Sequence, residues 1–172
     1  MVAYSPDRGF ELTGQAEQFL LSLGGEKFAV MGVVGKARTG KSYIINQLIG
    51  EQVFPVHGRV AACTKGILMS PVLRQEPKTG MKYLAIDTEG LGNGESTEER
   101  DSKLFLLNML TCSLLIYNSV GIIDEHALNA LSLVVGLGKC LNQDIEEEDK
   151  LSPADSSFPS FFWLIRDFVL KM

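Results

Sequence analysis

The segment from Val33 to Gly50 contains the feature that most restricts how this chain can fold. Its residues Gly35 to Ser42 read G-x-x-x-x-G-K-S, the pattern of a phosphate-binding loop that joins a strand to a helix. Glycine lets backbone N–H groups approach a phosphate, Lys41 would place its ammonium on the outer phosphates, and the Ser42 hydroxyl would face Mg²⁺. The first turn of the following helix adds N–H donors and a favourable dipole. The pattern therefore predicts an α/β domain of the P-loop type.

The residues on either side of this loop fit a strand and a helix. Phe28 to Val34 form a short apolar run, as expected of a strand that is buried on both faces. Tyr43 to Ile49 carry apolar side chains at helical spacing, and Gly50 is suited to end the helix. A glycine-rich turn that binds nothing is the alternative, but strand, loop and helix occur here in the order that phosphate binding requires.

Charge, hydropathy and cysteine content narrow the class of protein. The 172 residues suffice for one compact domain, and a net charge of −5 gives no indication of a nucleic-acid-binding surface. The N-terminus lacks the apolar segment of a signal peptide, and the apolar stretch Leu104 to Val120 is interrupted by polar residues and short for a membrane span. Three widely spaced cysteines without a C-x-x-C pair are typical of reduced thiols. We expect a cytoplasmic protein with no transmembrane segment and no nucleic-acid partner.

A second motif, D-T-E-G, occupies Asp87 to Gly90 at the end of an expected strand. An aspartate in this place can hold Mg²⁺, usually through a water molecule, and Gly90 could offer its N–H to the γ-phosphate. The glycine-rich residues Gly90 to Glu99 suit a loop that orders when that phosphate is bound. D-x-x-G alone also fits a simple strand-to-turn corner. Downstream of a phosphate loop it predicts the other half of a nucleotide site.

The rest of the pattern predicts a three-layer domain with a mostly parallel sheet. Further strands are expected at Ile67 to Arg74, Lys82 to Asp87, Cys112 to Tyr117 and Phe161 to Ile165, and the first two of these should form an antiparallel pair at one edge of the sheet. Further helices are expected from Gln15 to Leu23, after a cap at Thr13, and from the solvated charge cluster at Glu98 to Asp101 through Leu110. Another helix is expected to begin at Asp124, with the apolar residues of its buried side at Leu128, Leu131, Val134 and Val135. Tyr4 to Leu12 is expected to be an extended or loop segment, and loops are expected at Glu51 to Cys63 and Asn142 to Ser160.

Five separated stretches resemble the large GTPase domain of the guanylate-binding proteins, the branch of the dynamin superfamily that also contains the atlastins. They are G-K-A-R-T-G-K-S (Gly35 to Ser42), C-T-K-G (Cys63 to Gly66), D-T-E-G-L (Asp87 to Leu91), Y-N-S-V-G-I-I-D (Tyr117 to Asp124) and F-F-W-L-I-R-D-F (Phe161 to Phe168). They occur in the family's order and span nearly all of the chain. The Arg166-Asp167 pair is the most specific element, since the sequence lacks the N/T-K-x-D motif with which ordinary small GTPases read guanine.

The resemblance implies a role for each motif. Nucleotide binding would involve Gly35, Lys36, Ala37, Arg38, Thr39, Gly40, Lys41, Ser42, Asp87, Thr88, Glu89, Gly90, Leu91, Arg166 and Asp167, while Mg²⁺ would be held by Ser42, Thr64 and Asp87. Catalysis would use Arg38, Lys41 and Thr64. In this reading Asp167 binds guanine, and Arg38 acts as an internal arginine finger that neutralises charge on the transferring phosphoryl group. The alternative for Arg38 is a surface side chain at a tolerant position of the loop.

The sequence departs from the family pattern in two places. Ala62 stands where well-known vertebrate members carry a serine that helps to place the attacking water. Sequences of plant and protist type also depart from the vertebrate pattern at this position, and the G-K-A-R and C-T-K-G stretches look more like theirs. Water placement would then rely on backbone groups or another side chain. The chain also stops shortly after Asp167, so we expect residues 1–172 to be the N-terminal part of the GTPase domain, with an incomplete sheet and without the last strand, the guanine cap and the helical domain.

These observations predict a protein that binds GTP with Mg²⁺, hydrolyses it by in-line attack of water, and forms a homodimer in a nucleotide-dependent way. The alternative is a non-catalytic guanine-nucleotide-binding interaction module, and a weaker one is ATP as the ligand. Membrane association is expected only through regions that this chain lacks. The lone histidines His57 and His126 are expected to be surface residues, and Cys63 to serve packing.

Overall fold

A mixed β-sheet forms the centre of the molecule. The computed structural model describes residues 2–5, 7–56, 64–94, 96–121 and 159–167, together with 125, 128, 129, 132, 135 and 136. Its strands are β1 (Val2–Ser5), β2 (Gly9–Leu12), β3 (Ala29–Val34), β4 (Ile67–Met69), β5 (Arg74–Gln75), β6 (Lys82–Thr88), β7 (Leu114–Val120) and β8 (Ser160–Arg166). They are ordered β2-β1-β4-β6-β3-β7-β8, and β5 pairs with β6. The main helices are α1 (Gly14–Ser22), α2 (Lys41–Ile49) and α3 (Glu98–Thr111).

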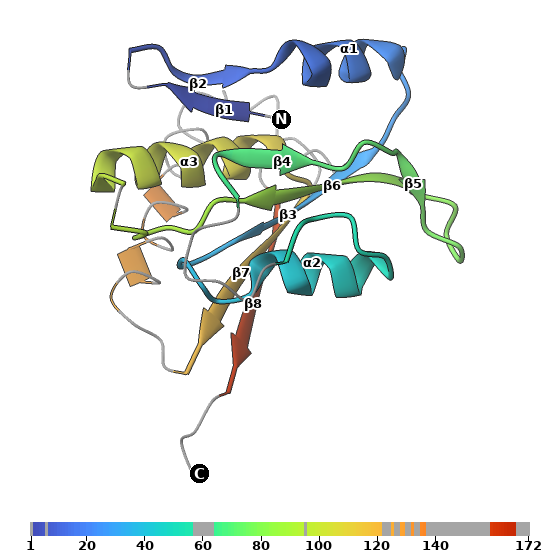
Figure 1. The fold of residues 1–172 in the computed structure, drawn as a ribbon. Coiled ribbons are helices and arrows are strands. Elements are labelled where there is room, and N and C mark those ends of the chain that lie inside the picture. Colours follow the sequence, from blue (N-terminus) through green and yellow to red (C-terminus); the bar gives the residue numbers. More distant parts are fainter. Residues whose placement is uncertain are drawn as a thin grey trace, which may run out of the picture.

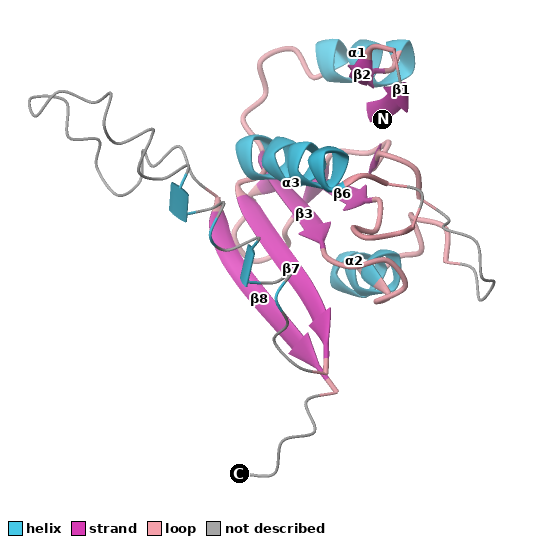
Figure 2. Ribbon diagram, turned by 90° about the vertical axis from the view of Figure 1, so that its left-hand side faces the viewer, coloured by secondary structure: helices cyan, strands magenta, loops and turns pink. Residues whose placement is uncertain are grey.

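The parallel part of the sheet carries the core of the domain. Strand β3 pairs in parallel with both β6 and β7, and β7 pairs in parallel with β8. Successive residues of β3 face opposite layers: Val34 packs with Leu104 and Phe105 of α3, whereas Val33 packs with Ile45 of α2. Figures 1 and 2 show these two helices on opposite faces of the strands. The predicted three-layer α/β fold with a mostly parallel sheet is thus confirmed.

The helices begin and end at the residues whose chemistry favours it. Thr97 caps α3 by accepting a hydrogen bond from Arg100 N at 3.2 Å, and Thr13 caps α1 in the same way from Ala16 N at 3.4 Å. Gly50 ends α2 in a left-handed conformation with φ of 77°, and its N–H donates to the carbonyls of Asn46 and Gln47. The predicted cap at Thr13 and the predicted end of the helix at Gly50 are confirmed.

Two strands near the N-terminus correct the expected architecture. The segment Tyr4 to Leu12, expected to be extended or a loop, is largely extended, but its pairing was not predicted: β1 and β2 form an antiparallel hairpin in which Val2 pairs with Leu12 and Ser5 with Gly9. Strand β1 then pairs with β4. The antiparallel pairing of β4 with β6 is confirmed, but its expected position at the edge of the sheet is wrong, because this hairpin extends the sheet beyond β4. Strands of four residues are too short to show a clear alternation in the sequence.

Two residues in the helix expected after Asp124 are exposed rather than buried. Leu128 and Val135 were expected to be buried, but their side chains are 53% and 56% exposed. Residues 125, 128, 129, 132, 135 and 136 are helical, and this spacing places all of them on one face, which is turned to solvent. The expectations for Asp124, Leu131 and Val134, for the histidines His57 and His126, and for Ala62 and Cys63 lie outside the described residues.

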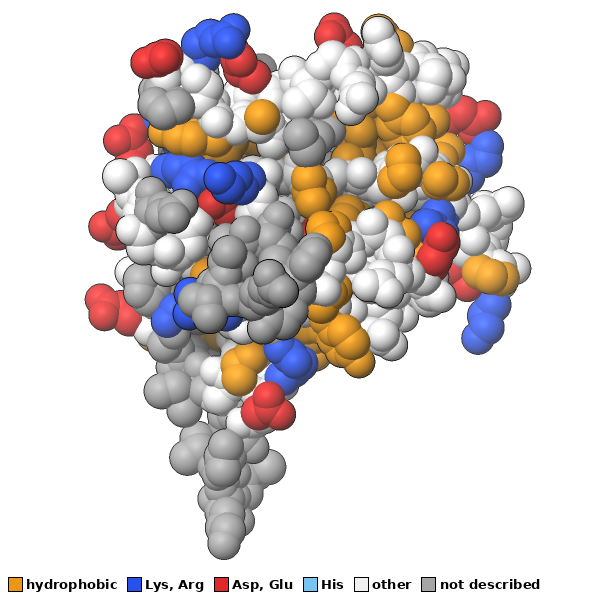
Figure 3. All heavy atoms as spheres, in the orientation of Figure 1, with side chains coloured by type: hydrophobic (Ala, Val, Ile, Leu, Met, Phe, Trp, Pro, Cys, Tyr) orange, Lys and Arg blue, Asp and Glu red, His pale blue; other side chains and the backbone are white. Residues whose placement is uncertain are grey.

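The surface of the described residues mixes both signs of charge. On the face shown in Figure 3, acidic and basic side chains are interspersed rather than separated into one region each. Among the described residues, no helix combines the length and the apolar character that crossing a membrane requires.

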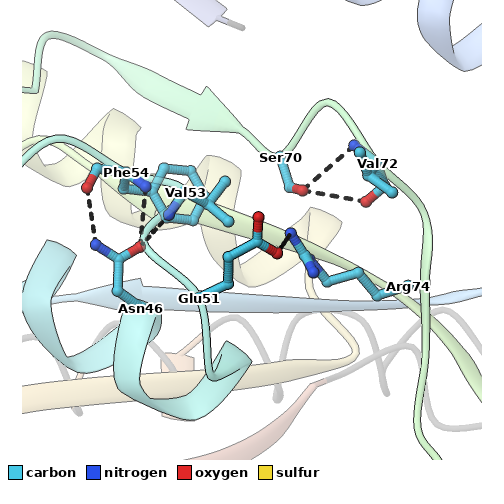
Figure 4. A network of polar contacts seen from close by, with 7 residues as sticks. All are labelled: Asn46, Glu51, Val53, Phe54, Ser70, Val72 and Arg74. Carbon is cyan, nitrogen blue, oxygen red and sulfur yellow. Dashed lines mark hydrogen bonds and ion pairs between the residues drawn. The ribbon is translucent and has the colours of Figure 1, made fainter.

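A small polar network fixes the loop that follows α2 (Figure 4). The Asn46 side chain donates to the Phe54 carbonyl at 2.7 Å and accepts from the N–H groups of Val53 and Phe54 at 3.0 and 2.9 Å. Nearby, Arg74 forms an ion pair with Glu51 at 2.8 Å. Because the amide satisfies three backbone groups, the loop can carry the Phe54 ring into the core next to Ile45.

Close packing between β3 and the end of α3 gives a test of this core. A Cβ on Gly32 would lie 2.5 Å from Cys112 Sγ and 3.1 Å from Ile86 Cγ1. We expect Gly32→Ala to lower the free energy of unfolding by about 1–3 kcal/mol, because the tightly packed core must shift. Cys112→Ala removes the sulfur atom, so the double variant should lose less stability than the sum of the two single variants. Urea unfolding of the four proteins measures this coupling, and strictly additive losses would contradict the proposed clash.

Candidate phosphate-binding site

The loop from Gly35 to Ser42 leaves the carboxyl end of β3, the edge where ligands of such sheets bind. It needs glycine at its start because a Cβ on Gly35 would lie 2.2 Å from the Asn118 carbonyl oxygen of β7. Within the loop, Gly40 and Arg38 have left-handed backbone conformations, with φ of 76° and 64°. A left-handed arginine is uncommon and carries strain, which is a feature typical of functional loops.

The interior of the loop is organised around the Lys36 carbonyl. This oxygen accepts hydrogen bonds from Thr39 Oγ1 at 2.8 Å and from Lys41 Nζ at 2.9 Å. Lys41 is only 6% exposed, and this burial lowers its pKa from 10.5 to about 8, although the negative charges of Asp87 and Glu89 partly offset the effect. A desolvated ammonium gains much from an incoming anion, so the loop is electrostatically suited to phosphate.

Three oxygen-bearing side chains meet beside this lysine. Ser42 Oγ and Thr64 Oγ1 both donate to Asp87 Oδ2, at 2.7 and 2.8 Å. Asp87 is fully buried, and its second oxygen, Oδ1, has no hydrogen-bond partner among the described residues. Burial raises the pKa of Asp87, and the two hydroxyls and the Lys41 charge oppose this rise. Hydroxyl and carboxylate oxygens are the ligands that Mg²⁺ prefers, and a buried, unsatisfied carboxylate oxygen fits such an ion.

The second motif lies directly on the phosphate loop. Leu91 N donates to the Gly35 carbonyl at 3.1 Å, and Ala37 N donates to the Leu91 carbonyl at 2.9 Å. Gly90 touches Ala37 so closely that a Cβ at this position would lie 2.2 Å from Ala37 Cα. The Thr88 hydroxyl donates a 2.8 Å hydrogen bond to Asn108 Oδ1 of α3, which fixes this end of the motif. The predicted second half of the site is therefore in contact with the first.

Glu89 joins the second motif to the Thr64-Lys65-Gly66 segment. Its buried carboxylate accepts from Gly66 N at 2.7 Å and from Asn93 Nδ2 at 2.6 Å, and forms an ion pair with Arg100 of α3 at 2.6 Å. The Arg100 guanidinium in turn lies 4.4 Å from the centre of the Tyr4 ring. The expected solvated helix start is therefore wrong for Arg100, whose side chain is 14% exposed, because it neutralises a buried carboxylate.

Strand β8 closes the other side of the loop. Arg166 donates through Nε to Asn118 Oδ1 at 3.2 Å and through Nη2 to the Thr39 carbonyl, and Asn118 Nδ2 donates to the same carbonyl at 2.8 Å. Asp167 follows with φ of 52° and an exposed side chain.

The structure thus brings together most of the residues that the sequence predicted for the site. The phosphate loop, Thr64, the residues from Asp87 to Leu91, and Arg166 all meet at the carboxyl edge of the sheet. Arg38 lies exposed on the loop, and Asp167 directly follows Arg166. Sequence reasoning missed Arg100 and Asn118 as members of this site. The signals for Asn118 were a polar residue in an apolar strand and its place in the family-like stretch Tyr117 to Asp124, and for Arg100 there was none.

Fold and site together define a P-loop α/β domain. The sequence model described as "Guanylate-binding protein, N-terminal domain" matches residues 8–172, and the chain belongs to this family. It is 36% identical to guanylate-binding protein 5 of Mus musculus over 171 residues, 38% to guanylate-binding protein 4 of Homo sapiens over 149 residues and 37% to guanylate-binding protein 1 of Homo sapiens over 161 residues.

The matches cover most of this chain but a minor part of each relative. They include 95%, 83% and 89% of this chain, and the chain spans 29%, 23% and 27% of the length of the three relatives. Among solved structures, the chain is similar to a crystal structure of Toc33 from Arabidopsis thaliana, with a TM-score of 0.48 and 22% identity, over 81% of this chain and 63% of that one.

The buried lysine makes the stability of the free protein depend on pH. Because the pKa of Lys41 is about 8 in the folded chain and ordinarily 10.5, the unfolded chain binds a proton that the folded chain has released between these values. Stability should therefore rise with pH in this window, by about 2 kcal/mol between about pH 7.5 and about pH 9.5. The measurement is the difference in urea unfolding between wild type and Lys41→Met at both pH values, which cancels the other titrating groups.

The exposed lysine Lys27 provides the matched control for this experiment. Lys27→Met removes the same charge without removing a buried one, so its difference from wild type should not change over the same interval. A Lys41→Met difference that is equally constant would contradict the desolvation of Lys41.

Proposed function

We propose that this chain binds GTP together with Mg²⁺ and hydrolyses it by in-line attack of water on the γ-phosphate. One observation carries the proposal: the buried Lys41 ammonium lies in a glycine-containing loop beside Asp87, whose Oδ2 accepts from two hydroxyls and whose Oδ1 has no hydrogen-bond partner among the described residues. This is a set of a cation, backbone donors and hard oxygen ligands in a low-dielectric setting, where electrostatic stabilisation of phosphoryl transfer is strong. Membership in the guanylate-binding protein family supports the same reaction.

Each part of the loop would then have a distinct task. Lys41 would bind the β- and γ-phosphates, and the N–H groups at the start of α2 would bind the phosphate oxygens. Ser42, Thr64 and Asp87 would hold the metal ion, which when bound neutralises charge on the phosphates. Arg38 lies exposed on the loop, where it would reach the transferring group and stabilise charge that develops in the transition state. Gly90 N–H would contact the γ-phosphate.

Guanine would be read by Asp167. A carboxylate can accept from both N1–H and the 2-amino group of guanine, whereas adenine offers neither donor. Asp167 follows the carboxyl end of β8, and Arg166 connects that end to the phosphate loop. We also propose that residues 1–172 are the N-terminal part of a GTPase domain, and that it acts in the cytoplasm, in keeping with the buried free thiol of Cys112.

Nucleotide-dependent self-association is the remaining part of the proposal. Glu89 bonds to Gly66, and its neighbour Gly90 lies against Ala37, so a γ-phosphate that displaces one segment would displace the other. Such coupled ordering would create a surface that exists only with GTP, and a homodimer could form on it. If the site binds GTP but does not hydrolyse it, the chain is a guanine-nucleotide-dependent interaction module. The first test below distinguishes this alternative from a GTPase.

The role of Arg38 predicts a separation of binding from catalysis. We expect Arg38→Ala to bind GTP within a few-fold of wild type and to hydrolyse it about a hundredfold more slowly, because the guanidinium acts mainly on transition-state charge. Fluorescent GTP titration and phosphate release measure the two effects, and Arg8→Ala, an exposed arginine of the N-terminal hairpin, is the control. An equal loss of both properties, or of neither, would count against the finger role. Binding of GTP by wild type without phosphate release would favour the interaction module.

The role of Asp167 predicts a change of base preference. Wild type should prefer GTP over ATP by roughly a hundredfold, since a charge-assisted pair of hydrogen bonds is worth on the order of 3 kcal/mol. Asp167→Asn should lose affinity for GTP and gain affinity for XTP, because an amide can donate to the 2-oxo group of xanthine. Competition of GTP, ATP and XTP against a labelled nucleotide tests this. Equal binding of ATP and GTP by wild type, with a mutant indifferent to XTP, would exclude Asp167 as the guanine reader.

A further inference from the structure

We propose that Asn118 is a positioning residue that orients the phosphate loop and joins it to the strand that carries the base reader. The inference rests on the proposed nucleotide-binding function and adds a residue to it. Asn118 is completely buried near the carboxyl end of β7, in a strand that is otherwise apolar over Leu114 to Tyr117. A buried amide in such a strand is costly unless each of its polar atoms is paired, and in Asn118 both are.

The residue contacts the phosphate loop at two points. Its backbone carbonyl lies against Gly35 at the start of the loop, so closely that any Cβ at Gly35 would overlap it. Its side-chain Nδ2 donates at 2.8 Å to the carbonyl of Thr39, four residues further along. One residue of β7 therefore fixes both the entry of the loop and the peptide that precedes Gly40.

The bond to the Thr39 carbonyl sets the direction of a donor that faces the ligand. In a trans peptide the C=O and the following N–H point in opposite directions. Holding the Thr39 oxygen toward Asn118 and Arg166 turns the Gly40 N–H to the opposite side, away from β7 and β8. The two donors from Asn118 and Arg166 occupy both lone pairs of that oxygen, so the peptide has one preferred orientation. The left-handed Gly40 then starts α2.

The other half of the amide fixes Arg166. Asn118 Oδ1 accepts from Arg166 Nε at 3.2 Å, and this bond also determines the amide orientation, since a rotated amide would turn its NH₂ group toward the guanidinium. Arg166 immediately precedes Asp167. The spacing between the base reader and the phosphate loop is therefore set by Asn118 together with Arg166, and any nucleotide that spans the two parts depends on it.

The test compares two buried asparagines that make the same kind of bonds. Asn46 also donates to a backbone carbonyl and accepts at Oδ1, but it serves the loop around Phe54 rather than the site. We expect Asn118→Leu to lower the affinity for GTP about tenfold or more, because the free energy of one buried hydrogen bond corresponds to about a tenfold change in a dissociation constant. The variant should also have a smaller preference for GTP over ATP. Asn46→Leu should lose comparable thermal stability and keep both affinities. Binding by Asn118→Leu within twofold of wild type, or an equal loss in Asn46→Leu, overturns the inference.

A second measurement does not depend on the nucleotide. Amide hydrogen exchange of the ligand-free chain should become at least tenfold faster in the peptide that contains Gly40 and Lys41 for Asn118→Leu and remain at the wild-type rate for Asn46→Leu. If wild type binds no nucleotide, the proposed function fails while the exchange data still decide the positioning role. Should Asn118→Leu fail to fold, Asn118→Asp keeps the acceptor for Arg166 and replaces the donor to Thr39 by a charged acceptor; it is compared by hydrogen exchange with Asn46→Asp, which adds the same charge. Unchanged exchange in the phosphate loop of a folded Asn118 variant overturns the inference.

Discussion

Three close approaches between backbone segments, each possible because one residue is a glycine, hold the site of this protein together. A Cβ on Gly35 would lie 2.2 Å from the Asn118 carbonyl oxygen, one on Gly66 would lie 2.2 Å from the Val2 carbonyl oxygen, and one on Gly90 would lie 2.2 Å from Ala37 Cα. Each glycine therefore lets a different segment approach: β7 reaches the phosphate loop, β1 reaches the segment after Thr64, and the D-T-E-G motif reaches the loop itself. Since real Cβ atoms do not tolerate such distances, no larger residue can stand at these three places without moving the backbone. The assembly of the carboxyl edge of the sheet depends on them.

Charge burial is the second constraint on the design of this edge. Lys41, Asp87 and Glu89 are all buried within one region, and Arg100 is nearly so. Groups of this kind cost free energy on transfer from water, and the cost is reduced only where each finds a partner. Glu89 has three partners, including the Arg100 ion pair, whereas Asp87 retains one unsatisfied oxygen and Lys41 bonds to a neutral carbonyl. Asp87 Oδ1 and the Lys41 ammonium are the groups that a cation and an anion would contact, whereas Glu89 is already paired; Arg100 Nε also has no partner among the described residues. This division separates ligand-binding groups from supporting groups in the same cluster.

The sequence predicts the local parts of this structure and the meeting of its two main motifs, but not most of the other long-range contacts. The phosphate loop, the cap at Gly50 and the strand that carries Asp87 near its end follow from short patterns in which neighbouring residues determine the backbone. The hairpin of β1 and β2 was missed because strands of four residues contain too few positions for a period to be recognised. Arg100 and Asn118 were missed for another reason: their partners are distant along the chain, as Asn118 and Thr39 are separated by 79 residues. A charged residue in an acidic helix start and a lone amide in an apolar strand look the same whether or not a distant partner exists.

The position of Val2 affects how the protein can be labelled. The Val2 carbonyl lies against Gly66, and Val2 pairs with Ile67, the residue that follows Gly66, so Val2 lies beside the segment that carries Thr64. A purification tag or a fluorescent group joined there without a long spacer would crowd this segment and would report on its own interference as well as on the protein. A dye on Leu21, which is 73% exposed on α1, would avoid that crowding.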